Sequence, residues 1–204
     1  MKQFEVPTFY RSPLLSKIKA QRKIEDPRKK DFTPTSLQIG DFTFVIARHF
    51  GFWYGVENAI ERSYKALQEN PGKRIFLLSQ MIHNPAVNAD LTSNGIQFLQ
   101  DTNGKQLIAF ETLTPNDVVL IPAFGTTLEI EQKLQALGID IQTYNTTCPF
   151  VEKVWNRSEK LSETQHTIII HGKHDHEETR ATFSHAVANS PALIVKDMQE
   201  AELL

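Results

Sequence analysis

Five short polar segments of this sequence carry the side chains that could do chemistry. Each follows an apolar run, and they read HFGFWYG, QMIHNP, PAFGTT, NTTCPFV and GKHDHEETRAT. The second contains His83, the fourth contains the thiol of Cys148, and the fifth contains two histidines and two glutamates. Histidines and backbone amides at helix starts suit an anionic group, and a thiol at a helix start favours its thiolate form. These residue types predict an anion site, a metal site or both.

The elements that must position these segments follow a repeating pattern from residue 42 onward. Apolar runs alternate with amphipathic segments, which is typical of parallel βαβ units. We expect strands at residues 42–47, 75–79, 117–121, 139–144, 167–171 and 192–196. We expect helices at residues 55–69, 84–93, 126–137, 149–162 and 176–186. Because the carboxyl ends of parallel strands lie at one edge of a sheet, the five segments are expected to share one polar pocket.

The predicted fold class is α/β, with two similar three-layer units of mainly parallel sheet. We expect the first unit at residues 42–114 and the second at residues 115–204. Residues 1–41 are expected to form a basic N-terminal arm with one short helix at residues 13–23. The first 35 residues hold nine basic and four acidic side chains. An arm exposed to solvent explains this charge, and binding to RNA or another anionic partner is the alternative explanation.

The composition limits the possible partners and location. A net charge of −2 and a pI near 6.4 give no electrostatic reason to expect nucleic acid as a partner. No stretch approaches the roughly 20 apolar residues of a membrane helix, and the N-terminal residues lack the apolar core of a signal peptide. The single cysteine, Cys148, excludes an internal disulfide and fits a reducing compartment. We therefore expect a cytoplasmic protein with no membrane partner.

The order of five motifs resembles the LytB/IspH family of 4-hydroxy-3-methylbut-2-enyl diphosphate reductases. The motifs are GF-x-x-GV-x-x-AI, HN-P-x-V, A-x-G, TCP-x-V-x-KV and H-x-E-x-x-AT, and they run from about residue 42 to the C-terminus. The resemblance implies a trefoil-like architecture of three α/β units around a [4Fe-4S] cluster that three cysteines hold. It also implies a two-electron removal of the substrate hydroxyl as water, with ferredoxin or flavodoxin as electron donor. The products would be isopentenyl and dimethylallyl diphosphate, in the non-mevalonate isoprenoid pathway.

The resemblance also assigns roles to four residues of this sequence. His83 matches the histidine that holds the substrate diphosphate, and His176 matches a second histidine that contacts substrate. Glu178 matches the glutamate that helps to deliver the proton. Cys148 matches one of the cluster cysteines. A carboxyl group that stays protonated in a dry pocket is suited to such a proton transfer.

Two positions depart from the family pattern, and one part of it has no counterpart. The first cluster cysteine of the family falls at Trp53, and the histidine of the A-x-G motif falls at Phe124. We expect Trp53 to pack the hollow where a cluster would lie. The sequence ends at Leu204, before the third unit of the family with its last cysteine and Ser-x-Asn motif. With one thiolate, that of Cys148, the chain is not expected to hold a stable [4Fe-4S] cluster, and self-association through an uncovered edge is expected.

Three functions remain open at this point. The first is the reductase of the family, here as an incomplete or inactive chain. The second is a non-catalytic module that binds diphosphates. The third is a zinc hydrolase, whose candidate residues are His171, His174, His176 and Glu178.

Overall fold

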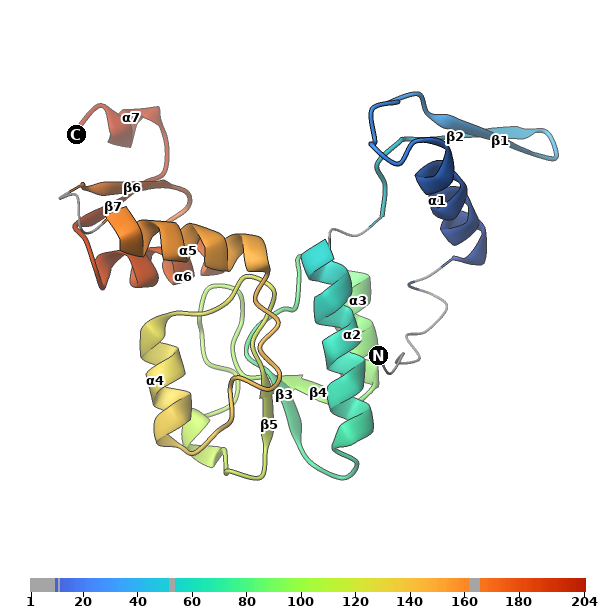
Figure 1. Cartoon of the computed structure of the whole chain (residues 1–204). Coiled ribbons are helices and arrows are strands. Elements are labelled where there is room, and N and C mark those ends of the chain that lie inside the picture. The colour runs from blue at the N-terminus through green and yellow to red at the C-terminus, as the bar shows by residue number, and fades with distance from the viewer. Residues whose placement is uncertain (1–9, 11, 52–53, 162–165) are drawn as a thin grey trace. The chain divides into compact units, whose positions relative to one another are not determined.

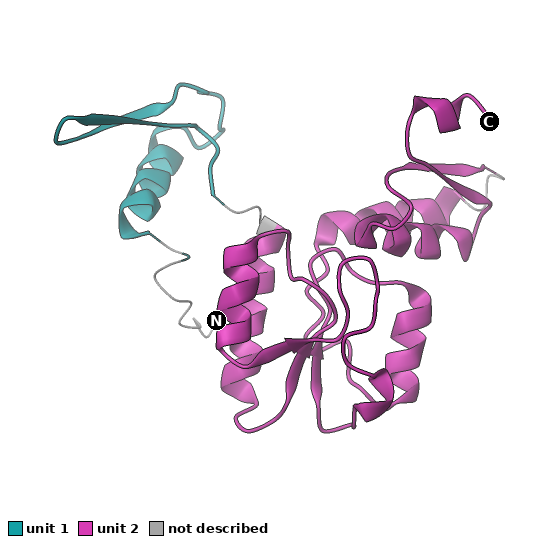
Figure 2. Ribbon diagram, turned by 180° about the vertical axis from the view of Figure 1, so that it is seen from behind, with its two compact units in different colours: residues 1–53 teal, residues 54–204 magenta. Residues whose placement is uncertain are grey.

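A computed structural model gives the fold of the chain. It describes residues 10, 12–51, 54–161 and 166–204. The chain divides into two compact units, residues 1–53 and residues 54–204, which Figure 2 shows in different colours. We describe each unit separately. None of the helices in the described ranges combines the length and the apolar character needed to cross a membrane.

The described part of unit 1 contains helix α1 and a β-hairpin. Helix α1 (Pro13–Glu25) confirms the helix expected at residues 13–23. Strands β1 (Thr35–Ile39) and β2 (Phe42–Ile46) pair antiparallel. The turn between them has Gly40 at its first position with φ +57°, as a two-residue hairpin turn requires. This corrects our expectation that residues 42–47 open a parallel α/β unit, because the tight turn pairs them with the strand just before.

Two arginines of unit 1 form ion pairs within the unit. The Nη1 atom of Arg22 lies 2.9 Å from Oδ2 of Asp31, and its Nε atom donates to Oγ1 of Thr35 at 2.9 Å. The Nη2 atom of Arg48 lies 3.3 Å from Oδ2 of Asp26. Part of the basic charge of the expected arm is therefore paired with carboxylates of the same unit.

Unit 2 is built on a three-stranded parallel sheet with the strand order β4-β3-β5 (Figure 1). Ile75 of β3 pairs with Ile96 of β4 on one side and with Val118 of β5 on the other. Helices α2 and α3 lie on one face of this sheet and α4 on the other (Figure 1). The bounds are α2 Tyr54–Glu69, β3 Ile75–Leu77, α3 Pro85–Ser93, β4 Ile96–Phe98, η2 Phe110–Thr112, β5 Val118–Leu120 and α4 Leu128–Ala136. The α/β class with parallel sheets is confirmed.

The rest of unit 2 contains a second parallel sheet of two strands, β6 and β7. Helix α6 packs against both strands and also contacts α4 and α5. The bounds are α5 Pro149–Leu161, β6 Ile168–His171, α6 Glu177–Val187, β7 Ala192–Val195 and α7 Met198–Ala201. Each of the helices expected from residue 55 onward is therefore present.

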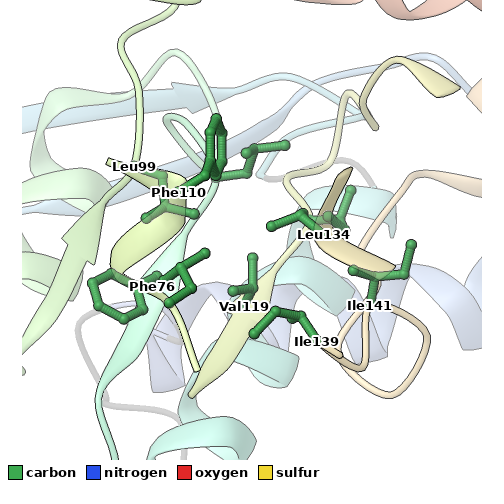
Figure 3. Close-up of a cluster of buried hydrophobic side chains, with 10 residues drawn as sticks. Phe76, Leu99, Phe110, Val119, Leu134, Ile139 and Ile141 are labelled. Atoms are coloured by element: carbon green, nitrogen blue, oxygen red, sulfur yellow. The ribbon is translucent and has the colours of Figure 1, made fainter. Parts of the chain in front are cut away.

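Strands β3 and β5 of unit 2 are buried along their whole length, as expected of strands with two covered faces. Phe76 and Val119, which pair across neighbouring strands, belong with Leu134 of α4 to a buried cluster that Figure 3 shows. The cluster consists of Phe76, Leu78, Leu99, Phe110, Leu113, Val119, Ile121, Leu134, Ile139 and Ile141. This packing fixes the carboxyl ends of β3 and β5, where the loops of interest begin.

Two sequence expectations differ from the structure within unit 2. Residues 139–144 form no regular strand, and only an isolated bridge joins Ile121 to Asn145. Asp140 accepts from the N–H groups of Gln142 and Thr143, and this local turn competes with strand pairing. The second difference concerns the boundary that we expected between residues 114 and 115. One sheet crosses this boundary, because β5 pairs with β3. The trefoil-like arrangement of three units stays a prediction.

Candidate functional site

His83 lies in the loop that follows β3, and two asparagines of α3 hold this loop. Asn84 caps α3 by accepting from backbone N–H groups of its first turn. Asn88 is buried, accepts from the Met81 N–H at 3.1 Å and donates to the Ile82 carbonyl at 2.9 Å. Asn88 was not expected from the sequence, although Leu91, three residues later on the same face of α3, is apolar.

Phe124 lies in the loop that follows β5, and close packing fixes that loop. A Cβ atom added to Gly125, whose φ is +76°, would lie 2.2 Å from the indole ring of Trp155. The Ala123 carbonyl accepts from the Cys148 N–H at 2.9 Å. The loop that carries Phe124 therefore contacts both the start of α5 and a side chain about two turns further along it.

The rings of His83, Phe124 and His176 lie together at the carboxyl edge of the sheet. The Nε2 atoms of His83 and His176 are 3.0 Å apart. Phe124 stacks on His83, with ring centroids 4.6 Å apart and an interplanar angle of 24°. The His83 side chain is 44% exposed, so a ligand can reach it from solvent. We call His83 and His176 the histidine pair.

The histidine pair is backed by a buried carboxyl group, that of Glu177. Its side chain is 5% exposed, and its Oε1 atom lies 3.8 Å from Nε2 of His83. Its Oε2 atom accepts from the Ser79 hydroxyl. Burial raises the pKa of Glu177 above its usual value, opposed by the Ser79 hydrogen bond and the nearby His83 and Arg180. The buried acid of this site is thus Glu177.

Glu178, for which the family resemblance implies proton delivery, is exposed in this chain. Its backbone N–H donates to Nδ1 of His176 at 3.3 Å, which caps α6. The sequence analysis missed Glu177 because the family motif leaves that position open. One signal in the sequence could have found it: Ala181, four residues later on the same helix face, is apolar. A small cavity beside Glu177 is lined by Ser79, Thr126 and Arg180, among others.

Cys148 lies at a second place along the same edge, where α5 begins. Its side chain is half-buried and it is a free cysteine. A Cβ atom added to Gly55, in the first turn of α2, would lie 2.5 Å from the Cys148 Sγ atom. The start of α2 therefore packs directly on the thiol. Trp53, which matches the first cluster cysteine of the family, lies outside the described residues.

The residues proposed for a zinc hydrolase do not come together. The Nε2 atom of His171 lies 3.2 Å from the Lys196 carbonyl. That of His174 lies 2.9 Å from Oε2 of Glu200, and His176 faces His83 instead. The described part of the chain contains no group of three or more histidine, cysteine, aspartate or glutamate side chains that could hold a metal ion. The zinc interpretation is therefore not supported.

Comparison with known families gives a match over most of the chain. Residues 44–204 match the family described as LytB protein. The chain is 43% identical, over 166 residues, to the 4-hydroxy-3-methylbut-2-enyl diphosphate reductase of Synechocystis sp., covering 81% of this chain and 42% of that relative. It is 39% identical over 200 residues to the Nostoc sp. enzyme of the same name, covering 98% of this chain and 46% of that relative. The chain thus spans less than half the length of these curated relatives.

Solved structures agree on the fold. The structure described as (E)-4-hydroxy-3-methyl-but-2-enyl diphosphate reductase, the terminal enzyme of the non-mevalonate pathway, has a TM-score of 0.61 at 24% identity. It is matched over 74% of this chain and 50% of its own. The E-1-hydroxy-2-methyl-but-2-enyl-4-diphosphate reductase from Plasmodium falciparum has a TM-score of 0.64 at 22% identity, over 76% of this chain and 44% of its own.

Proposed function

Because this chain belongs to the LytB family, we propose that its histidine pair holds the diphosphate group of the substrate of a 4-hydroxy-3-methylbut-2-enyl diphosphate reductase. The observation that supports this most is the convergence of His83 and His176, which are 93 residues apart in the sequence, with Nε2 atoms 3.0 Å apart. Two imidazoles that meet at one point can both donate to one anionic oxygen when they are protonated. The start of α6 lies directly behind His176 and adds the favourable end of its helix dipole.

The reaction of the whole reductase is part of the same proposal. It removes the substrate hydroxyl as water with two electrons, supplied by a ferredoxin or flavodoxin in the cytoplasm. Glu178 would help to deliver the proton, and Cys148 would be one thiolate ligand of a [4Fe-4S] cluster. Such a cluster, when bound, would supply the electrons to the substrate.

The residues of this chain do not by themselves fit that cluster. Cys148 is the one cysteine of the sequence. The described ranges hold no group of three or more histidine, cysteine, aspartate or glutamate side chains that could bind a metal ion. A [4Fe-4S] cluster in proteins is held by several thiolates. We therefore assign no step of the reaction to a cluster in this chain.

Because the chain has one cysteine, Cys148, a second candidate function is favoured, that of a non-catalytic diphosphate-binding module. Phe124 supports it as well, because this apolar ring stacks on His83 at the position where the family has a histidine. Self-association is proposed with it, since apolar side chains on and after the β6–β7 sheet are exposed. Examples are Ile169, Leu193 and Met198.

Calorimetric titration with pyrophosphate tests the shared part of both candidates. We expect weak binding that depends on His83. His83→Ala should weaken it about tenfold or more, because a charge-assisted hydrogen bond contributes about 1.5–3 kcal/mol. His174→Ala is the matched control, since His174 pairs with Glu200 away from the histidine pair. Binding that is unchanged in His83→Ala would overturn the proposal.

A further inference from the structure

The hydrogen bonds of the histidine pair determine where its protons lie. Nδ1 of His176 accepts from the Glu178 N–H, so the proton of a neutral His176 is on Nε2. That Nε2–H points to Nε2 of His83 at 3.0 Å, which must then be the acceptor. While this hydrogen bond between the two histidines is present, the Nε2 lone pair of His83 is occupied, and His83 cannot take up a second proton there.

The closest acid to this nitrogen is Glu177, and one of its oxygens is available. Oε2 accepts from Ser79, whereas Oε1 is buried and has no hydrogen-bond partner among the described residues. Oε1 lies 3.8 Å from Nε2 of His83. The charged or titratable groups that face Glu177 are His83, from the loop before α3, and Arg180 and Glu178, from its own helix. An unpaired carboxylate in this buried position is costly, whereas the protonated acid is not.

We propose that Glu177 stores the proton that His83 takes up when an anionic group enters between the two histidines. This inference rests on the proposed diphosphate site. An anionic oxygen that accepts from Nε2 of His176 leaves the lone pair of His83 Nε2 free. The O–H bond at Glu177 Oε1 then breaks and an N–H bond forms at His83 Nε2.

The transfer turns an acid and an imidazole into a carboxylate and an imidazolium, so the net charge of the site is unchanged. The imidazolium donates to the anion, and the carboxylate remains beside Arg180 and the Ser79 hydroxyl. No proton has to come from solvent. Glu177 acts through His83 and is a positioning residue of the site.

The test is pyrophosphate calorimetry in buffers of different ionisation enthalpy, which counts the protons taken up on binding. At about pH 8, Glu177→Gln should take up about one proton more than the wild type and bind about tenfold more weakly. At about pH 6, where solvent supplies the proton readily, the two affinities should converge. Glu129→Gln is the matched control, because it makes the same substitution in the first turn of another helix, α4. Equal proton uptake by the wild type and Glu177→Gln would overturn the inference.

An infrared measurement on the wild type keeps the test independent of how the variant folds. The unliganded protein should show the carbonyl band of a protonated, buried carboxylic acid, and pyrophosphate should abolish it. If the wild type binds pyrophosphate but shows no such band, the inference that Glu177 stores a proton is wrong and the proposed function stands. If the wild type does not bind pyrophosphate, the proposed function fails, and this inference with it.

Discussion

Two regions at the edge of the sheet, the histidine pair and the surroundings of Cys148, are built in different ways. The histidine pair is supported by three residues beneath its open side, namely the Asn84 cap, Asn88 and the buried Glu177. Cys148 instead packs against Gly55, and the described residues form no group of three or more side chains that could hold a metal ion. An anion site needs few residues, because helix starts and one or two histidines supply its hydrogen-bond donors. A cluster site needs several thiolates from separate segments at once.

The largest expected effect concerns the Cys148 region. After anaerobic reconstitution with iron and sulfide, the chain should show no stable [4Fe-4S] cluster, because one thiolate cannot replace several. Absorption spectroscopy and iron analysis measure this directly, with a Cys148→Ala variant as the control for unspecific iron. A stoichiometric cluster that depends on Cys148 would contradict this prediction, since the Cys148 region would then be a working cluster site.

A smaller effect is expected when the support of the histidine pair is removed. Asn88→Ala leaves the Met81 N–H and the Ile82 carbonyl without their partner, and each unsatisfied buried group costs about 1–3 kcal/mol. We expect the free energy of unfolding to fall by about 2–4 kcal/mol in urea denaturation. Asn94→Ala is the control, because the Asn94 side chain donates to Asp90 at an exposed position. Equal losses in the two variants would show that the His83 loop does not depend on Asn88.

The parts of the fold that the sequence predicted are those set by local patterns. The helix starts at Pro85 and Pro149 and the strands β3 and β5 of the main sheet follow from apolar periodicity and proline position. Strand β4 was not expected, because its three residues are too short an apolar run to stand out. The β1–β2 hairpin was missed because its apolar run reads the same in a parallel or an antiparallel sheet. Pairing depends on the Gly40 turn.

The candidate site was predicted in part, for a similar reason. The sequence placed His83 and His176 at strand ends, and the structure brings their rings together. It could not rank Glu177 against Glu178, because neighbouring residues of a helix face different directions and burial depends on what packs there. The carboxyl expected to lie in a dry pocket therefore proved to be exposed, while its neighbour is buried.

The smallest expected effect concerns the aromatic layer that joins the two regions. His185 stacks on Trp155 at a centroid distance of 3.7 Å and an interplanar angle of 9°, and Trp155 lies against Gly125 in the Phe124 loop. Burial lowers the pKa of His185, opposed by its contact with the Thr126 carbonyl. The folded state therefore binds this proton less readily than the unfolded state does.

Stability from His185 should thus be complete above the unfolded pKa of about 6.5 and be lost as the pH falls below it. Urea unfolding at about pH 7.5 and about pH 5.5 measures the loss in the wild type. Glu177 contributes in the opposite sense, because its pKa is raised, so the wild-type curve alone is not decisive. The difference between the wild type and His185→Gln isolates the histidine, since that variant keeps the Glu177 contribution and lacks the titrating ring. If both proteins change equally with pH, the stack that joins the histidine pair to the Cys148 region does not respond to protonation of His185.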